Sequence, residues 1–92
     1  MADSTGFDIK GKVIWVTGSS RGIGAATARH LAAQGATVVV HGRSLDSLEP
    51  LAAELGGSAV AGDVRDDAAM TSAEEKIVKR HGRLDGVVAN VG

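Results

Sequence analysis

The sequence predicts an α/β fold in which helices pack on both faces of an open parallel sheet. Two observations lead to this prediction. Four short apolar runs recur along the 92-residue chain, and stretches of helical length and periodicity separate them. Three of the runs are rich in valine and mostly uninterrupted by polar residues, as in strands that are covered on both faces. The resulting βαβαβαβ order is typical of a parallel sheet with right-handed crossovers.

The chain divides into an N-terminal arm and one domain. Residues 1–10 are polar and mixed, and we expect a loose arm in which Phe7 and Ile9 touch the domain. Residues 11–92 form the domain. Its strands are expected at residues 12–17, 36–41, 58–61 and 84–90.

The first helix is expected at residues 22–34, ending at Gly35, a residue that readily adopts a positive φ. Its packed stripe is expected to contain Ile23, Ala26, Leu31 and Ala33.

The second helix is expected at residues 45–55, where leucines recur at spacings of three and four before Gly56 and Gly57. Pro50 conflicts with a helix interior, so either the helix begins near Ser47 or it kinks.

The third helix is expected at residues 67–81, ending at Gly82, with Asp66 as its N-cap and Met70, Ala73 and Ile77 facing the sheet.

Right-handed connections place the four strands in the order 3-2-1-4. The first two helices then lie on one face of the sheet and the third helix lies on the other, which gives three layers. The fourth strand is left as an open apolar edge. A chain of this kind is expected to self-associate or to need a complementing chain.

Composition excludes several classes of function. The chain has no cysteine, which removes disulfides, thiol nucleophiles and cysteine metal sites. Its net charge of −1 gives no general basic field for nucleic acid or membrane lipids. The three histidines have no ligand spacing, so no metal site is expected. No apolar stretch is long enough to span a membrane and no signal peptide is evident, so the cytoplasm is the expected location.

One glycine-rich loop joins the first strand to the first helix, and it reads TGSSRGIG at residues 17–24. Gly18 allows backbone angles that a side chain forbids, Gly22 lets a ligand approach, and Gly24 lets the helix pack close to the sheet. The N–H groups of the first helical turn then face outward as a seat for a pyrophosphate. The alternative is a turn whose glycines serve packing only. The candidate cofactor-binding residues of the loop are Gly18, Ser20, Arg21, Gly22, Ile23 and Gly24.

The chain resembles the N-terminal half of the short-chain dehydrogenase/reductase family, whose Rossmann-type fold carries TGxxxGxG after its first strand. Further similar segments are GKV at residues 11–13, GDV at 62–64 and LDGVVANVG at 84–92. The last segment resembles the family's NNAG strand. Asn90 and Gly92 keep their places, whereas Ala89 and Val91 depart from the pattern and put the hydrogen bonding of that strand in doubt.

The resemblance implies a nicotinamide dinucleotide as cofactor, and the end of the second strand bears on which one. Gly42 stands where family members that use NAD usually carry an acid, and Arg43 and Ser44 follow it. Arg43 and Arg21 are predicted to bind the 2′-phosphate of NADP(H). NADP(H) is therefore the preferred cofactor and NAD the other possibility. The alternative is that both arginines are solvated surface charges.

The resemblance also implies contacts at the two ends of the cofactor. Asp63 is expected to accept a hydrogen bond from the adenine amino group, with Val64 against the ring, although Asp63 can instead cap local backbone amides. Asn90 and Gly92 are expected beside the nicotinamide ribose, and Asn90 can also tie the first and fourth strands together. For His41 a solvated place at the strand end is favoured over contact with the adenosine.

No residue of the chain is assigned as catalytic. Catalysis in the family uses a Tyr-x-x-x-Lys pair with a serine and an asparagine on later elements, and this chain contains no tyrosine. The chain alone is therefore expected to be inactive, and its substrate would be bound by residues beyond Gly92.

Three functions stay open: the NADP(H)-binding portion of an oxidoreductase acting on an alcohol or carbonyl by hydride transfer, a non-catalytic dinucleotide-binding module, and a structural fragment that pairs through its open edge.

Overall fold

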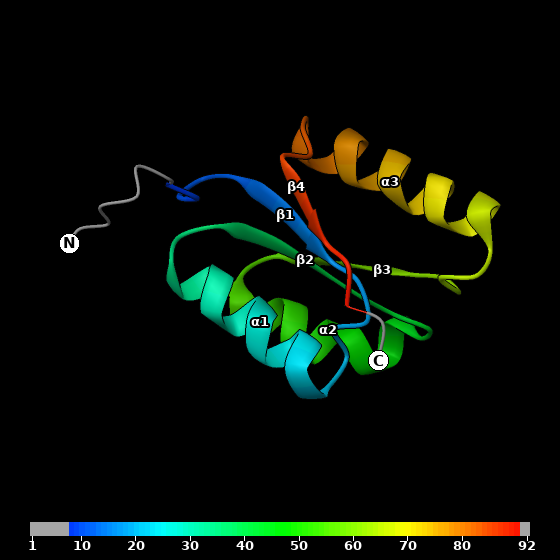
Figure 1. Ribbon diagram of the computed structural model, residues 1–92, viewed down its shortest axis with the longest axis horizontal. Coiled ribbons are helices and arrows are strands. Elements are labelled where there is room, and N and C mark those ends of the chain that lie inside the picture. The colour runs from blue at the N-terminus through cyan, green and yellow to red at the C-terminus, as the bar shows by residue number, and fades with distance from the viewer. Residues whose placement is uncertain (1–7, 91–92) are drawn as a thin grey trace.

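The computed structural model describes residues 8–90, which form a four-stranded parallel sheet and three helices (Figure 1). The strands are β1 (Val13–Val16), β2 (Thr37–Gly42), β3 (Ser58–Ala61) and β4 (Gly86–Val88). Their order in the sheet is β3-β2-β1-β4, which confirms the order predicted from crossover handedness. Phe7, Val91 and Gly92 lie outside the described residues.

Strands β1 and β4 are shorter than the apolar runs suggested, but the pairing between them extends beyond their ends, whereas β3 has the predicted bounds and β2 is shifted by one residue. Thr17 N–H donates to the carbonyl oxygen of Val88 over 3.0 Å, and Asp85 N–H donates to that of Val13 over 2.9 Å. The regular strand β4 ends at Val88 because the chain then turns toward the glycine loop, where Asn90 N–H donates to Thr17 Oγ1 over 3.0 Å.

Helices α1 (Gly22–Ala33) and α2 (Leu45–Leu55) cover one face of the sheet, and α3 (Asp67–His81) covers the other (Figure 1). Alternate strand residues point to opposite faces, so each face has its own core. The core under α1 and α2 includes Ile14, Val16, Val38, Val40 and Leu48. The core under α3 includes Val13, Trp15, Val39, Val60, Ala73 and Ile77.

Leu31 packs partly against the core as predicted, but the rest of the packed face of α1 differs from the prediction. Its buried residues are Gly24, Ala25 and Ala28, whereas Ile23 is 78% exposed and Ala26 and Ala33 are also exposed. The cause is close packing at Gly24, where a Cβ would collide with the carbonyl oxygen of Gly18. Gly24 must therefore face the loop, and Ile23, about 100° away around the helix, turns to solvent.

The helix α2 spans Leu45–Leu55, the predicted range, which excludes the alternative of a late start near Ser47. Pro50 lies inside the helix and is exposed. Proline removes one helix hydrogen bond, but burial of Leu48, Leu51 and Ala52 offsets that loss. Leu45 is 45% exposed and does not join the core.

The helix α3 follows its prediction closely. The Asp66 side chain accepts a hydrogen bond from Ala69 N–H over 3.2 Å, and Gly82 ends the helix at a φ of 82°. Ala73 and Ile77 are buried and Met70 packs partly against the same core. The N-cap thus fixes where the helix begins, and a narrow stripe of three side chains packs it on the sheet.

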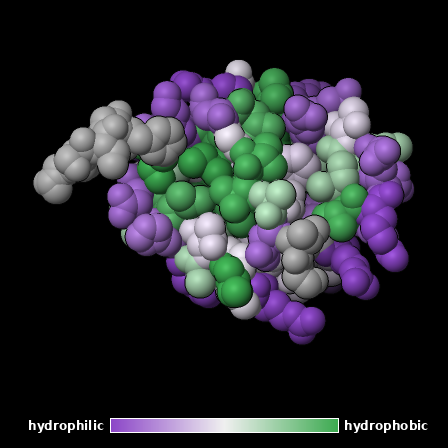
Figure 2. Space-filling view, viewed as in Figure 1, coloured by the Kyte–Doolittle hydropathy of each residue, from purple (hydrophilic) through white to green (hydrophobic). Residues whose placement is uncertain are grey.

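The strand β4 forms one edge of the sheet, as predicted. Val87 in its centre is 53% exposed, and Figure 2 shows apolar surface gathered over β4 and β1. The opposite edge is β3.

Candidate functional site

The loops that follow all four strands begin at one edge of the sheet. Val16 of β1 is in register with Val40 of β2 and with Val88 of β4, and Gly42 is in register with Ala61 at the end of β3. In open α/β sheets, ligands bind outside the carboxyl ends of the strands, where the strand order reverses. Here that point lies between β1 and β4.

The glycine loop is held tightly at two of its three glycines. Gly18 has a φ of 60°, and a Cβ there would collide with the carbonyl oxygen of Asn90. A Cβ on Gly24 would collide with the carbonyl oxygen of Gly18 and would lie 2.7 Å from Asn90 Nδ2. Packing alone therefore demands glycine at both positions.

Gly22 has a different reason to be glycine. It has a φ of 65°, and a Cβ there would meet no atom within 4 Å. The N-terminus of α1 behind it has no side-chain cap and no acidic residue in its first turn. The first N–H groups of the helix are thus left at an open surface, beside the exposed Ile23. This part of the loop fits an anionic ligand.

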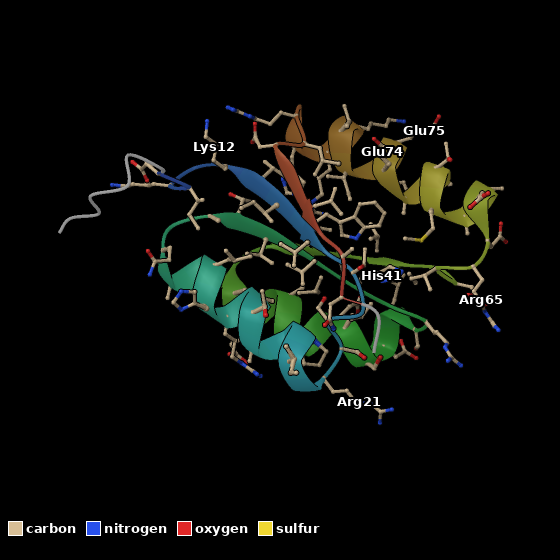
Figure 3. The ribbon with its side chains drawn as sticks, viewed as in Figure 1. Lys12, Arg21, His41, Arg65, Glu74 and Glu75 are labelled. Carbon is tan, nitrogen blue, oxygen red and sulfur yellow. The ribbon has the colours of Figure 1, made fainter. Side chains whose placement is uncertain are left out.

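Ser19 and His41 fix the rest of the loop, and the sequence did not indicate this role for either residue. Ser19 is fully buried; its Oγ donates to the carbonyl oxygen of Val16 over 2.7 Å and accepts from His41 N–H over 2.8 Å. His41 is only 2% exposed, so the expectation of a solvated histidine was wrong. Its ring lies within the molecule, whereas Arg21 and Arg65 extend outward (Figure 3). The uninterrupted valine run that leads into His41 was the sequence feature that could have indicated its burial.

Asn90 joins the end of β4 to the glycine loop. Its Nδ2 donates to the carbonyl oxygen of Gly18 over 3.0 Å, and its N–H donates to Thr17 Oγ1. The predicted tie between the first and fourth strands is therefore present. Gly92, the second residue predicted beside the nicotinamide ribose, lies outside the described part of the chain.

The segment after β2 combines a crowded glycine with two exposed polar residues. A Cβ on Gly42 would lie 3.3 Å from Leu48 Cδ2 and 3.3 Å from Ser20 Cβ, so Ser20 of the glycine loop packs beside this strand end. Arg43 and Ser44 are exposed. Ser44 is the N-cap residue of α2, and its side chain makes no capping hydrogen bond.

Asp63 lies after β3 and is paired with Arg65. Its Oδ1 accepts from Arg65 N–H over 2.9 Å, and its Oδ2 accepts from Arg65 Nη2 over 2.9 Å. The side-chain hydrogen bond with Arg65, followed by the backbone one, lowers the pKa of Asp63 to about 2, and the charge of Arg43 acts in the same direction. The local capping role considered for Asp63 is thus present, and Arg43 lies near enough to affect it. Val64 is 40% exposed beside this pair.

The structure brings together part of the predicted site. Gly18 and Gly24 of the loop meet Asn90, Ser20 of the loop meets Gly42, and the charge of Arg43 is close enough to lower the pKa of Asp63. Arg21 instead extends into solvent from the start of α1 (Figure 3). Within residues 8–90, no three potential metal-ligating side chains group together. None of the described helices has the length and apolarity needed to cross a membrane.

Comparison with known proteins agrees with this geometry. The chain is 40% identical over 89 residues to the oxidoreductase UcpA of Salmonella typhimurium, a match that covers 91% of this chain and 34% of UcpA. It is 37% identical over 91 residues to D-threitol dehydrogenase of Mycolicibacterium smegmatis, covering 94% of this chain and 35% of that protein. The chain thus spans about a third of the length of these relatives.

A similar solved structure is that of an actinorhodin polyketide ketoreductase with NADPH. It superposes with a TM-score of 0.82 at 31% identity, covering 89% of this chain and 33% of the ketoreductase. The sequence model of the short chain dehydrogenase family matches residues 12–92, which includes every strand, every helix and the glycine loop. The chain therefore belongs to the short-chain dehydrogenase/reductase family.

Proposed function

We propose that this chain binds NADP(H) and forms the cofactor-binding portion of an oxidoreductase that acts on an alcohol or carbonyl group. The observation that carries the proposal is the open, uncapped N-terminus of α1 behind Gly22, at the carboxyl edge of the sheet. A helix N-terminus without its own cap leaves N–H donors and a positive dipole end, which together suit a pyrophosphate. The nicotinamide, when bound, supplies the hydride chemistry.

The preference for NADP(H) over NAD(H) rests on the residues after β2. Gly42 leaves no carboxylate to repel a 2′-phosphate, and Leu48 and Ser20 crowd the space that a side chain there would need. Arg43 and the uncapped start of α2 lie next to it. The negative charge of Asp63 is offset by Arg65. The NADPH in the solved ketoreductase supports the same choice.

Catalysis is assigned to residues outside these 92. The chain has no tyrosine to act as the general acid, and proton transfer to a carbonyl oxygen needs such a group within hydrogen-bonding reach. We therefore expect the chain alone to bind cofactor without turnover. The cytoplasm stays the expected location.

The open edge of β4 favours a second role beside cofactor binding. Val87 is 53% exposed on an unpaired strand edge, which is a template for further strand pairing. A complementing chain, or a second copy, would cover this edge in the complete enzyme.

The direct test is calorimetric titration of the chain with NADP⁺ and, separately, with NAD⁺. Tighter binding of NADP⁺ supports the proposal. Equal affinities would contradict the NADP preference, and the absence of binding by either nucleotide would contradict cofactor binding itself.

Replacing Arg43 with alanine is expected to weaken NADP⁺ binding by roughly 10- to 100-fold, because a charge-assisted hydrogen bond to phosphate contributes about 1.5–3 kcal/mol. Affinity for NAD⁺, which has no 2′-phosphate, should change less than about twofold. Calorimetry on Arg43→Ala measures both, and Arg80→Ala on the exposed side of α3 serves as the control for lost positive charge. Equal weakening of the two nucleotides would rule out the phosphate contact.

A further inference from the structure

The ring of His41 joins the glycine loop to the end of β3. Its Nδ1 lies 3.0 Å from Gly18 N, and its Nε2 lies 2.9 Å from the carbonyl oxygen of Gly62. Gly62 directly precedes Asp63. One buried side chain therefore connects the loop beneath the proposed pyrophosphate seat to the segment proposed to face adenine.

These two partners fix the tautomer of His41. A backbone N–H can only donate and a carbonyl oxygen can only accept. Nδ1 must therefore be the unprotonated acceptor of Gly18 N–H, and Nε2 must carry the proton that it donates to Gly62. Only the neutral ring satisfies both contacts.

Protonation of His41 conflicts with this arrangement. The imidazolium has N–H groups on both nitrogens, so Nδ1–H would face Gly18 N–H, donor against donor. Either the loop or the ring must then move. Because Gly18 also accepts from Asn90 Nδ2 and its carbonyl oxygen lies against Gly24, a shift of Gly18 would disturb the first turn of α1.

Both hydrogen-bond partners of the ring are uncharged backbone groups, and among the described residues no charge contributes to the shift of its pKa. On the β1 side its neighbour is the indole of Trp15, edge-on with ring centroids 5.9 Å apart. After β3, Asp63 is paired with Arg65. Arg43, on its own segment, is exposed, and Arg21 of the glycine loop extends away (Figure 3).

We infer that neutral His41 is a positioning residue that holds the glycine loop in its nucleotide-binding conformation, and that its protonation releases the loop and weakens cofactor binding in acid. The inference rests on the proposed function, since it concerns the affinity of that same site. His41 touches neither the cofactor nor the reacting atoms in this account. It acts through Gly18.

The direction of the pH effect follows from burial. Desolvation lowers the pKa of His41 below its usual value of about 6.5, outweighing the carbonyl of Gly62, which acts in the opposite sense. The unfolded chain then binds more protons than the folded chain below about pH 6.5. The contribution of neutral His41 to stability and to nucleotide affinity is therefore fully present above about pH 6.5. It is lost as the pH falls through the lower pKa of His41 in the folded chain.

His81 is the matched control. Burial, followed by the charge of Arg80, also lowers its pKa, so it contributes acid sensitivity of the same sign. Its Nε2 lies 2.8 Å from Ser58 Oγ at the start of β3, away from the glycine loop. Replacing it should change acid stability and leave the pH dependence of nucleotide affinity in place.

The experiment compares the full chain with His41→Asn, His41→Gln and His81→Asn. Calorimetry gives the NADP⁺ affinity at pH 7.5 and pH 5.5; NADP⁺ is used because NADPH decomposes in acid, and titration of its 2′-phosphate is common to all four proteins. Emission of Trp15, the single tryptophan, reports protonation of the adjacent ring without any nucleotide.

In the unchanged chain, Trp15 emission should titrate with a midpoint below about 6.5. Its NADP⁺ affinity should fall between the two pH values by roughly two- to tenfold more than in either His41 variant, as expected for one hydrogen bond. The asparagine oxygen can replace Nδ1 as acceptor of Gly18 N–H, whereas glutamine reaches Gly62 instead. At pH 7.5, His41→Asn should therefore bind more tightly than His41→Gln.

Two outcomes would overturn the inference: a pH profile of affinity shared by the unchanged chain and a folded His41 variant, or no titration of Trp15 emission in the unchanged chain. The measurement of Trp15 emission uses only the unchanged chain, so it does not depend on whether a variant folds. Absence of NADP⁺ binding by the unchanged chain at pH 7.5 would instead contradict the proposed function, and would also end the claim that His41 serves nucleotide binding.

Discussion

Replacing Gly18 with alanine is expected to abolish measurable NADP⁺ binding and to lower the free energy of unfolding by about 2–5 kcal/mol. Left-handed backbone angles cost a residue with a Cβ about 1–2 kcal/mol, and Gly18 has a φ of 60°. Overpacking adds about 1–3 kcal/mol, because the new Cβ would collide with the carbonyl oxygen of Asn90. Relief of that collision must separate β4 from the loop. Urea unfolding and calorimetry measure the two effects.

Gly56 provides a matched control for Gly18→Ala. It has a φ of 68° at the end of α2, but a Cβ there would meet no atom within 4 Å. Gly56→Ala should therefore cost only the backbone component of about 1–2 kcal/mol, and its NADP⁺ affinity should stay within about twofold of the unchanged chain, since no contact of the site is touched. Equal stability losses in the two variants would show that the close approach of Asn90 to Gly18 adds no cost to a Cβ at that position.

The layer order and strand order could be predicted because they depend on features that are regular along the chain. Continuous valine runs indicate buried parallel strands, and the handedness of each crossover then leaves one arrangement. The observed order β3-β2-β1-β4 agrees with these two rules. Even the helix ends at Gly35, Gly56 and Gly82 followed from local chemistry, and each of these glycines has a positive φ.

The rotation of α1 could not be predicted in the same way. Hydrophobicity favoured Ile23 as a core residue, but the helix approaches the sheet so closely at Gly24 that only a glycine fits. Tertiary packing decided which side faces inward, and the larger apolar residue was left at the surface. That surface is the one proposed to meet the cofactor, so the departure from simple amphipathicity coincides with the functional site.

The candidate site was predicted by motif spacing rather than by contacts. The glycine loop and Asn90 were identified, and the structure places them together. The roles of Ser19 and His41 were missed because they depend on atoms of β1, of β2 and of Gly62 after β3, which meet only in the folded chain. Nothing in the sequence near His41 indicates that both ring nitrogens have backbone partners.

Replacing Ile77 with alanine is expected to lower the free energy of unfolding by about 2–5 kcal/mol, the range for deleting a buried isoleucine side chain down to Cβ. Ile77 is 1% exposed and packs with Ala73 against Trp15 and Val60. Few side chains hold α3 on the sheet, so this loss is a large part of the roughly 5–15 kcal/mol typical of a domain. Urea midpoints at constant m-value give the change.

Val78 is the matched control for Ile77, since it is the next residue of α3 and is 43% exposed. Val78→Ala should change stability by less than about 0.5 kcal/mol. Under conditions where Ile77→Ala is still folded, its NADP⁺ affinity should match that of the unchanged chain, because α3 lies across the sheet from α1, α2 and their core (Figure 1). A fall in affinity without unfolding would mean that the two layers are coupled through the sheet, with Trp15 beside His41 as the contact to test.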